Sequence, residues 1–291
     1  MKDNDIDDST APLIEHLAEL RSRLIYSVLA FAVAMVACFT VAGPVFDFLA
    51  RPLAALLIEN GQEPDLIFTG LQQGFMVQIR ISLFGGFMLA FPVIAWQMWR
   101  FVAPGLYRQE KRAFLPFLLA SPVLFLLGAA FAYYIVLPLA FDFFLGFQQL
   151  GGSSDLVPGG AIPEDGAGVS PDGEVGIQFL GTINEYLGLT MKFVIAFGLC
   201  FQLPVLLTLM AKADLVSSKG LRDVRKYAMV GILVLAAIVT PPDVVTQVIL
   251  FTVVYGLYEV SIFLVAMIDR RREAELRAQG LWDDGTAGEE T

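Results

Sequence analysis

The chain has 291 residues, of which 56% are hydrophobic and 16% are charged, and its mean hydropathy is +0.67. These values exclude a soluble globular domain of this length and indicate a protein that crosses a membrane several times. The net charge of −10 does not describe one acidic surface, because much of the acidic excess falls in loops expected on the outer side of the membrane.

Long apolar runs predict six membrane-spanning helices and therefore an all-α fold. A spanning helix needs about 20 mostly apolar residues, and the runs lack the alternation typical of membrane β-strands. Prolines inside the runs are expected to bend the helices, because each removes a backbone donor. The last two spans are predicted to be short, since the fifth reaches only about 20 Å against a hydrocarbon core of about 30 Å. The expected spans are residues 24–43, 75–96, 113–137, 187–211, 227–239 and 244–268.

Basic residues predict that both termini are cytoplasmic. With six spans and a cytoplasmic N-terminus, all but three of the 19 Lys and Arg residues fall on the cytoplasmic side, as the positive-inside rule requires. The first span lacks a small-residue cleavage site, so we expect it to be retained. The expected organisation is a cytoplasmic segment 1–23, a transmembrane domain 24–268 and a disordered cytoplasmic tail 269–291.

Two outer loops are expected, at about 44–74 and 138–186, and they differ in character. The first carries apolar residues such as Leu49, Leu53 and Leu57 at helical spacing, which predicts a short amphipathic helix at the outer interface. The centre of the second, residues 151–176, is rich in Gly, Pro and acidic residues and has no Lys or Arg. Such a segment is typical of a flexible loop, and a small ordered cap is the alternative.

The sequence offers little for catalysis. His16 is the only histidine, and there is no GxSxG or HExxH motif. Cys38 and Cys200 lie in the middle of spans without a partner at metal or redox spacing. We therefore expect no enzyme activity, cofactor, metal or nucleic-acid partner. A secondary transporter or channel is the alternative class, but it should carry polar groups near the membrane midplane, and apart from Gln202 the spans are nearly free of them.

Two charged motifs place carboxylates beside the ends of membrane helices. HLAELRSR, from His16 to Arg23, contains Glu19, and FVAPGLYRQEKR, at residues 101–112, contains Glu110. A carboxylate pairs bidentately with the planar guanidinium group of arginine, so these positions suit the capture of a basic peptide. The alternatives are a salt bridge from Glu19 to Arg23 one helical turn on, worth about 0.2–0.5 kcal/mol, and a solvated loop position for Glu110.

Four blocks in order along the chain resemble the TatC family of the twin-arginine protein translocase: HLAELRSRL, FVAPGLYRQEKR, FAYYIVLPLAF and TPPDVVTQ. The resemblance covers about residues 13–268. It implies a six-helix, glove-shaped receptor in the cytoplasmic membrane that binds the twin-arginine signal peptides of folded proteins. It also implies an oligomeric complex with single-span TatA-type and TatB-type partners, driven by the proton-motive force.

The resemblance also assigns roles to residues. For signal-peptide binding it implies Glu19, Leu20, Arg21, Phe101, Pro104, Tyr107 and Glu110. For contact with a partner helix it implies Gln202, Pro204 and Gln247, and for structural motifs Pro138, Pro241, Pro242 and Asp243.

One position departs from the family pattern. Where the family usually has FExP in the fourth span, this chain reads Phe201-Gln202-Leu203-Pro204. Gln202 can form hydrogen bonds but cannot carry a charge or a proton, so a family role that needs ionisation is not expected here. Contact with a polar residue of a partner helix and a hydrogen bond between two helices of this chain remain the alternatives.

Overall fold

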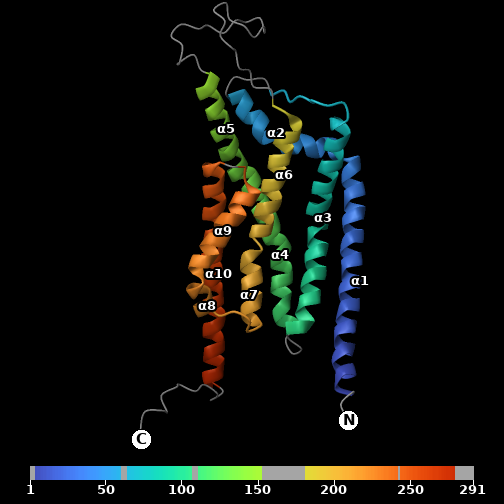
Figure 1. The fold of residues 1–291 in the computed structure, drawn as a ribbon, viewed down its shortest axis with the longest axis vertical. Coiled ribbons are helices and arrows are strands. Elements are labelled where there is room, and N and C mark those ends of the chain that lie inside the picture. The colour runs from blue at the N-terminus through green and yellow to red at the C-terminus, as the bar shows by residue number, and fades with distance from the viewer. Residues whose placement is uncertain (1–3, 60–63, 107–110, 153–180, 242, 279–291) are drawn as a thin grey trace, which may run out of the picture.

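The computed structural model describes residues 4–59, 64–106, 111–152, 181–241 and 243–278, and nearly all of them are helical (Figure 1). Within these residues, β-structure is limited to one isolated parallel bridge between Ile67 and Thr182. The all-α fold predicted from the apolar runs is confirmed.

The first two long helices, α1 (Asn4–Thr40) and α3 (Gln73–Leu106), lie side by side (Figure 1). Glycine permits their close approach, because a Cβ atom on Gly86 would lie 2.7 Å from the Met35 Cα. A larger residue there would push the helices apart. Because α1 begins at Asn4, the helix that contains the first predicted span also includes most of the segment 1–23.

The third span is longer than predicted. It consists of α4 (Lys111–Phe131), one π-helical turn (Ala132–Val136) and α5 (Leu137–Gly152), which follow one another without a loop. In the π-turn the Leu137 N–H donates to the Ala132 carbonyl, five residues back. The expectation of a loop from residue 138 is therefore wrong as far as Gly152. Residues 153–180, which include most of the predicted flexible segment, lie outside the described part.

The fourth span consists of two helices. α6 (Ile183–Cys200) ends and α7 (Leu203–Lys212) begins at a turn formed by Phe201 and Gln202. Pro204 lies in the first turn of α7, where a helix needs no backbone donor. The bend predicted from Pro204 is confirmed as a break between two helices.

An amphipathic helix, α2 (Ala42–Glu59), crosses one end of the molecule (Figure 1). Leu49, Leu53 and Leu57, spaced four residues apart, are buried, so one stripe of the helix faces the core. The helix predicted within residues 44–74 is confirmed.

Two tyrosines hold α2 by its backbone. The Tyr133 hydroxyl donates to the Phe48 carbonyl, and the Tyr186 hydroxyl donates to the Leu49 carbonyl. Pro52 lies four residues after Phe48 and has no N–H, so the Phe48 carbonyl lacks its usual helical donor. The Tyr133 hydroxyl satisfies that carbonyl.

The last part of the chain comprises α8 (Ser218–Asp223), α9 (Arg225–Val239) and α10 (Val244–Ala278). α9 is short, with 15 residues. The prediction that the last span is also short is wrong, because α10 has 35 residues and includes Arg270 to Arg272 and Arg277. The first ten residues of the tail expected to be disordered are therefore helical.

Five helical stretches of the described part could cross a membrane by length and composition. α9 is not among them, since 15 residues give about 22 Å of helix. The first residues of α1 and the last residues of α10 lie at one end of the molecule, which we call the terminal end, and α2 lies at the opposite end (Figure 1).

Candidate functional site

Glu19 lies on α1 near the terminal end, and its ion-pair partner Arg23 makes a polar contact with α3. The Arg23 Nε donates to the Glu19 Oε1 at 3.0 Å, and the Arg23 Nη2 also bonds to that oxygen. From its other side Arg23 is held by α3, because its Nη1 donates to the Gln97 Oε1 at 3.4 Å. The salt bridge that the sequence offered as the alternative for Glu19 is therefore formed.

This contact leaves the Glu19 carboxylate accessible. Its side chain is 35% exposed, whereas that of Arg23 is 16% exposed. The Oε2 of Glu19 has no hydrogen-bond partner among the described residues. Arg23, fixed between Glu19 and Gln97, orients the carboxylate, and one oxygen can still accept from a guanidinium group outside the chain.

The other residues assigned to signal-peptide binding are only partly described. Leu20 is 41% exposed, and it shares an uncovered apolar strip of α1 with Leu17 and Leu24. Arg21 is exposed and Phe101 is half-buried near the end of α3. Pro104 lies on α3, but its side chain is outside the described part. Tyr107 and Glu110 are outside it altogether, so a pairing of Glu110 with Glu19 stays a prediction.

Gln97 was not identified from the sequence. It lies directly after the predicted span 75–96, and its only signal is that it is a polar residue between the apolar residues Trp96 and Met98. Its contact with Arg23 depends on the register of α1 against α3, which the sequence does not reveal.

Gln202 is engaged inside the chain. Its Oε1 accepts from the Ser121 Oγ at 2.5 Å, and its Nε2 donates to the Ser121 carbonyl at 2.9 Å. Both contacts join the turn between α6 and α7 to α4. The hydrogen bond between helices that the sequence offered as an alternative is therefore present.

The other two residues assigned to partner contact lie on different helices. Pro204 is buried at the start of α7 and lines a groove with α4 and α10. Gln247 is half-buried in the first turn of α10. Among the described residues, the Gln247 side chain has no hydrogen bond to Gln202, so the structure does not join these positions into one site.

The motif TPPDVVTQ begins α10. Asp243 accepts from the backbone N–H of Thr246 at 2.7 Å and from the Thr246 hydroxyl. This geometry is that of a helix N-cap, which satisfies donors with no partner in the helix. Pro241 precedes the cap, Pro242 lies outside the described residues, and Pro138 is the second residue of α5, two residues after the π-turn ends.

A carboxylate that the sequence reasoning overlooked lies within the last span. Glu259 on α10 accepts from the Arg225 Nη2 at 2.6 Å and from the Tyr255 hydroxyl at 2.9 Å. The expectation that the spans are nearly free of polar or charged groups apart from Gln202 is wrong for this residue. Its signal was visible as the only acidic residue in the run from Val244 to Ile268.

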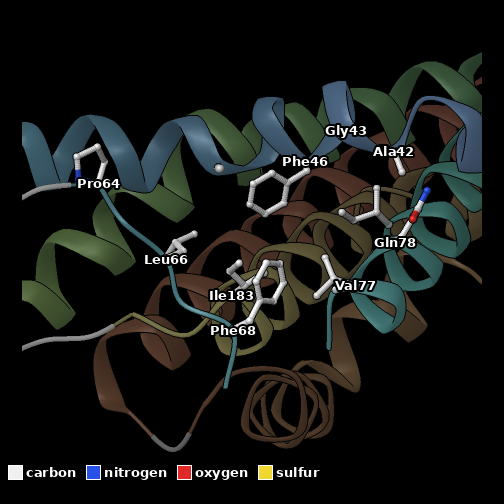
Figure 2. A pocket seen from close by; sticks show the side chains of 12 residues that line it. Ala42, Gly43, Phe46, Pro64, Leu66, Phe68, Val77, Gln78 and Ile183 are labelled. Carbon is white, nitrogen blue, oxygen red and sulfur yellow. The ribbon is translucent and has the colours of Figure 1, made fainter. Parts of the chain in front are cut away.

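A hollow of about 460 Å³ lies at the α2 end, far from Glu19. Phe46 from α2, Phe68 from the segment before α3, and Ile183 at the start of α6 line it, and Gln78 of α3 adds a polar group (Figure 2). It contains none of the residues assigned to peptide binding.

Comparison with known proteins places this geometry in a family. The model for the Sec-independent protein translocase protein (TatC) matches residues 15–252. The chain belongs to the TatC family. The TatC protein of Magnetococcus marinus is 45% identical over 276 residues, which cover 94% of this chain and 92% of that protein. The TatC protein of Aquifex aeolicus is 39% identical over 264 residues, covering 90% of this chain and 98% of that protein.

A solved structure agrees with the assignment. The crystal structure of a twin-arginine translocase receptor TatC aligns with a TM-score of 0.69 at 39% identity, covering 87% of this chain and 98% of that one. TatC is a component of protein transport, so the alternative of a small-solute transporter or channel is not favoured.

Proposed function

We propose that this chain is the receptor and core subunit of a twin-arginine translocase in the inner membrane. In this role it binds the twin-arginine signal peptides of folded proteins on the cytoplasmic side. With TatA-type and TatB-type single-span partners, it supports their export under the proton-motive force. The observation that carries the proposal is the match to TatC proteins over almost the whole chain, in sequence and in fold.

The proposed topology has six spans, with the terminal end in the cytoplasm. α9 is the fifth span and α10 the sixth, and the 15 residues of α9 suit a locally thinned bilayer. Supporting this topology, the first residues of α1 and the last residues of α10 lie at the same end (Figure 1), as an even number of spans requires. The concentration of Lys and Arg in segments at that end also agrees with a cytoplasmic position.

In the proposed peptide site, Glu19 and Glu110 each pair with one arginine of the signal peptide. Glu19 is suited to this role because Arg23 and Gln97 hold it in place and leave part of its carboxylate exposed. The apolar strip around Leu20 lies on the same helix and would pack against the hydrophobic part of the peptide. Arg21, Phe101, Pro104 and Tyr107 complete the proposed surface.

For partner helices we propose the surface that includes Gln202, Pro204 and Gln247. The bonds from Gln202 to Ser121 do not use every lone pair and proton of the amide, so a further hydrogen bond to a polar residue of a partner is chemically possible. Gln247, at the start of α10, offers a second amide.

The receptor role can be tested by measuring binding of a labelled twin-arginine peptide to the purified protein. Glu19→Gln and Glu110→Gln should each weaken binding by about 1.5–3 kcal/mol, or about ten- to a hundredfold, because a charge-assisted hydrogen bond is lost. Replacing the peptide's two arginines by lysines should weaken binding to the wild type, since lysine cannot pair bidentately.

The matched control is Glu185→Gln, which removes an exposed carboxylate at the start of α6, near the α2 end, and should bind the peptide as the wild type does. Equal peptide affinity in the wild type and both acid variants would exclude the paired-carboxylate site.

A further inference from the structure

A second groove, of about 320 Å³, lies nearer the terminal end between three helices. α7 forms its floor, because α7 packs against both α10 and α4, while α4 and α10 are not in extensive contact. In Figure 1, α7 lies between these two helices. The side chains that define the groove are Phe117, Leu124, Val205, Thr208, Leu264 and Arg271.

The walls of the groove are apolar. The only hydroxyl among these side chains, that of Thr208, donates to the Pro204 carbonyl of its own helix and so needs no partner from the groove. Each helix contributes residues at helical spacing, such as Leu264 and Arg271 on α10, which places them on one face. The groove therefore offers a hydrocarbon surface that runs along the helices.

Cations gather at one end of this surface. Arg271 lines the groove and is exposed, and it has no acidic partner in the described part of the chain. Lys212, the last residue of α7, holds its Nζ 5.0 Å from the centre of the Phe117 ring, another lining group. The two neighbouring arginines do not add a cation to the groove in this way. Arg272 pairs with Asp214, and Arg270 does not line the groove.

We propose that this groove binds an anionic phospholipid, with an acyl chain between α4, α7 and α10 and the phosphate at Arg271 and Lys212. Basic pockets between membrane helices suit anionic lipid head groups, and the apolar walls suit a lipid tail. The volume of about 320 Å³ fits a slender chain better than a partner helix, which is about 10–12 Å across with its side chains. The lipid belongs to the leaflet at the terminal end.

Lipid binding can be measured by native mass spectrometry of the full-length protein in neutral detergent, titrated with phosphatidylglycerol or with phosphatidylcholine. Phosphatidylglycerol should be retained more strongly by the wild type. Arg271→Gln should weaken its binding about fivefold, and Arg271→Gln with Lys212→Gln about 25-fold, because each cation near the head group contributes about 1 kcal/mol.

Arg270→Gln is the matched control, because it removes the same charge one residue away and should bind as the wild type does. Ala120→Trp, which fills the groove without changing its charge, should displace the lipid. Equal affinity in the Arg270→Gln and Arg271→Gln variants, or equal retention of the two lipids, would overturn the proposal. Loss of cross-linking to a partner helix in Ala120→Trp with unchanged lipid binding would assign the groove to that helix instead.

Discussion

At the scale of single residues, sequence reasoning identified the chemistry of the candidate site better than its contacts. The spacing of Glu19 and Arg23 predicts their salt bridge, because residues four apart share a helix face. The part played by Gln97 could not be predicted, since it depends on how α1 and α3 are aligned. The same holds for Gln202, whose neighbour Ser121 is 81 residues away in the sequence.

The pair formed by Gln202 and Ser121 leads to a prediction about stability. Gln202→Leu should lower the free energy of unfolding by about 0.6–1.7 kcal/mol, the range of hydrogen bonds between membrane helices. Ser121→Ala should have a smaller effect, because the Ser121 carbonyl still accepts from Gln202. Unfolding in detergent of the two single variants and the double variant would give the coupling energy.

The partner surface proposed for Gln202 makes a different prediction for the same variants. If Gln202 also contacts a partner helix, Gln202→Leu should reduce cross-linking to that helix and Ser121→Ala should not. An equal loss of cross-linking in both variants would mean that the pair acts only through the fold of this chain.

At the scale of helices, regular patterns were predictable and local exceptions were not. The leucines of α2 repeat every four residues, so the sequence predicts this helix. The continuation of the third span beyond Pro138 was missed because proline usually ends or bends a helix. Here a π-turn ends at Val136, two residues before Pro138, and such turns accommodate an extra residue inside a helix.

The hydrogen bond from the Tyr133 hydroxyl to α2 predicts that losing this hydroxyl lowers the stability of the protein. Tyr133→Phe should destabilise the protein by about 1–3 kcal/mol. Pro52 has no N–H to donate to the Phe48 carbonyl, so without the Tyr133 hydroxyl that carbonyl would be left without a donor. Thermal unfolding of the purified protein would measure the change. Tyr134→Phe is the control, since Tyr134 is 68% exposed and should be nearly neutral. Similar melting temperatures for both variants would contradict the role given to Tyr133.

At the scale of the whole molecule, composition alone predicted a helical membrane protein, and the basic residues predicted an orientation. The length of α10 was missed because the apolar run ends near Ile268, whereas the helix continues through Arg270 to Arg272. Hydropathy marks where a chain leaves hydrocarbon, and a helix can continue into water when its charged side chains are solvated.

The proposed orientation can be tested with single cysteines and a membrane-impermeant thiol reagent. Cysteines placed within residues 155–172 should react when the reagent is added outside intact cells, and Ser218→Cys should react only after lysis. The two native cysteines, Cys38 and Cys200, are both buried and can be replaced by alanine beforehand. The opposite labelling pattern would invert the topology.

The contacts of α10 also bear on the order in which the protein can be completed during synthesis. Tyr258 donates to the Leu221 carbonyl, Asp269 accepts from the Ser218 N–H, and Arg272 pairs with Asp214. Each contact ties α8 or the residues before it to α10, which is synthesised after them. Until α10 has been synthesised, Asp214, Ser218 and Leu221 lack these partners, so a chain that stops before Tyr258 would leave all three contacts unmade.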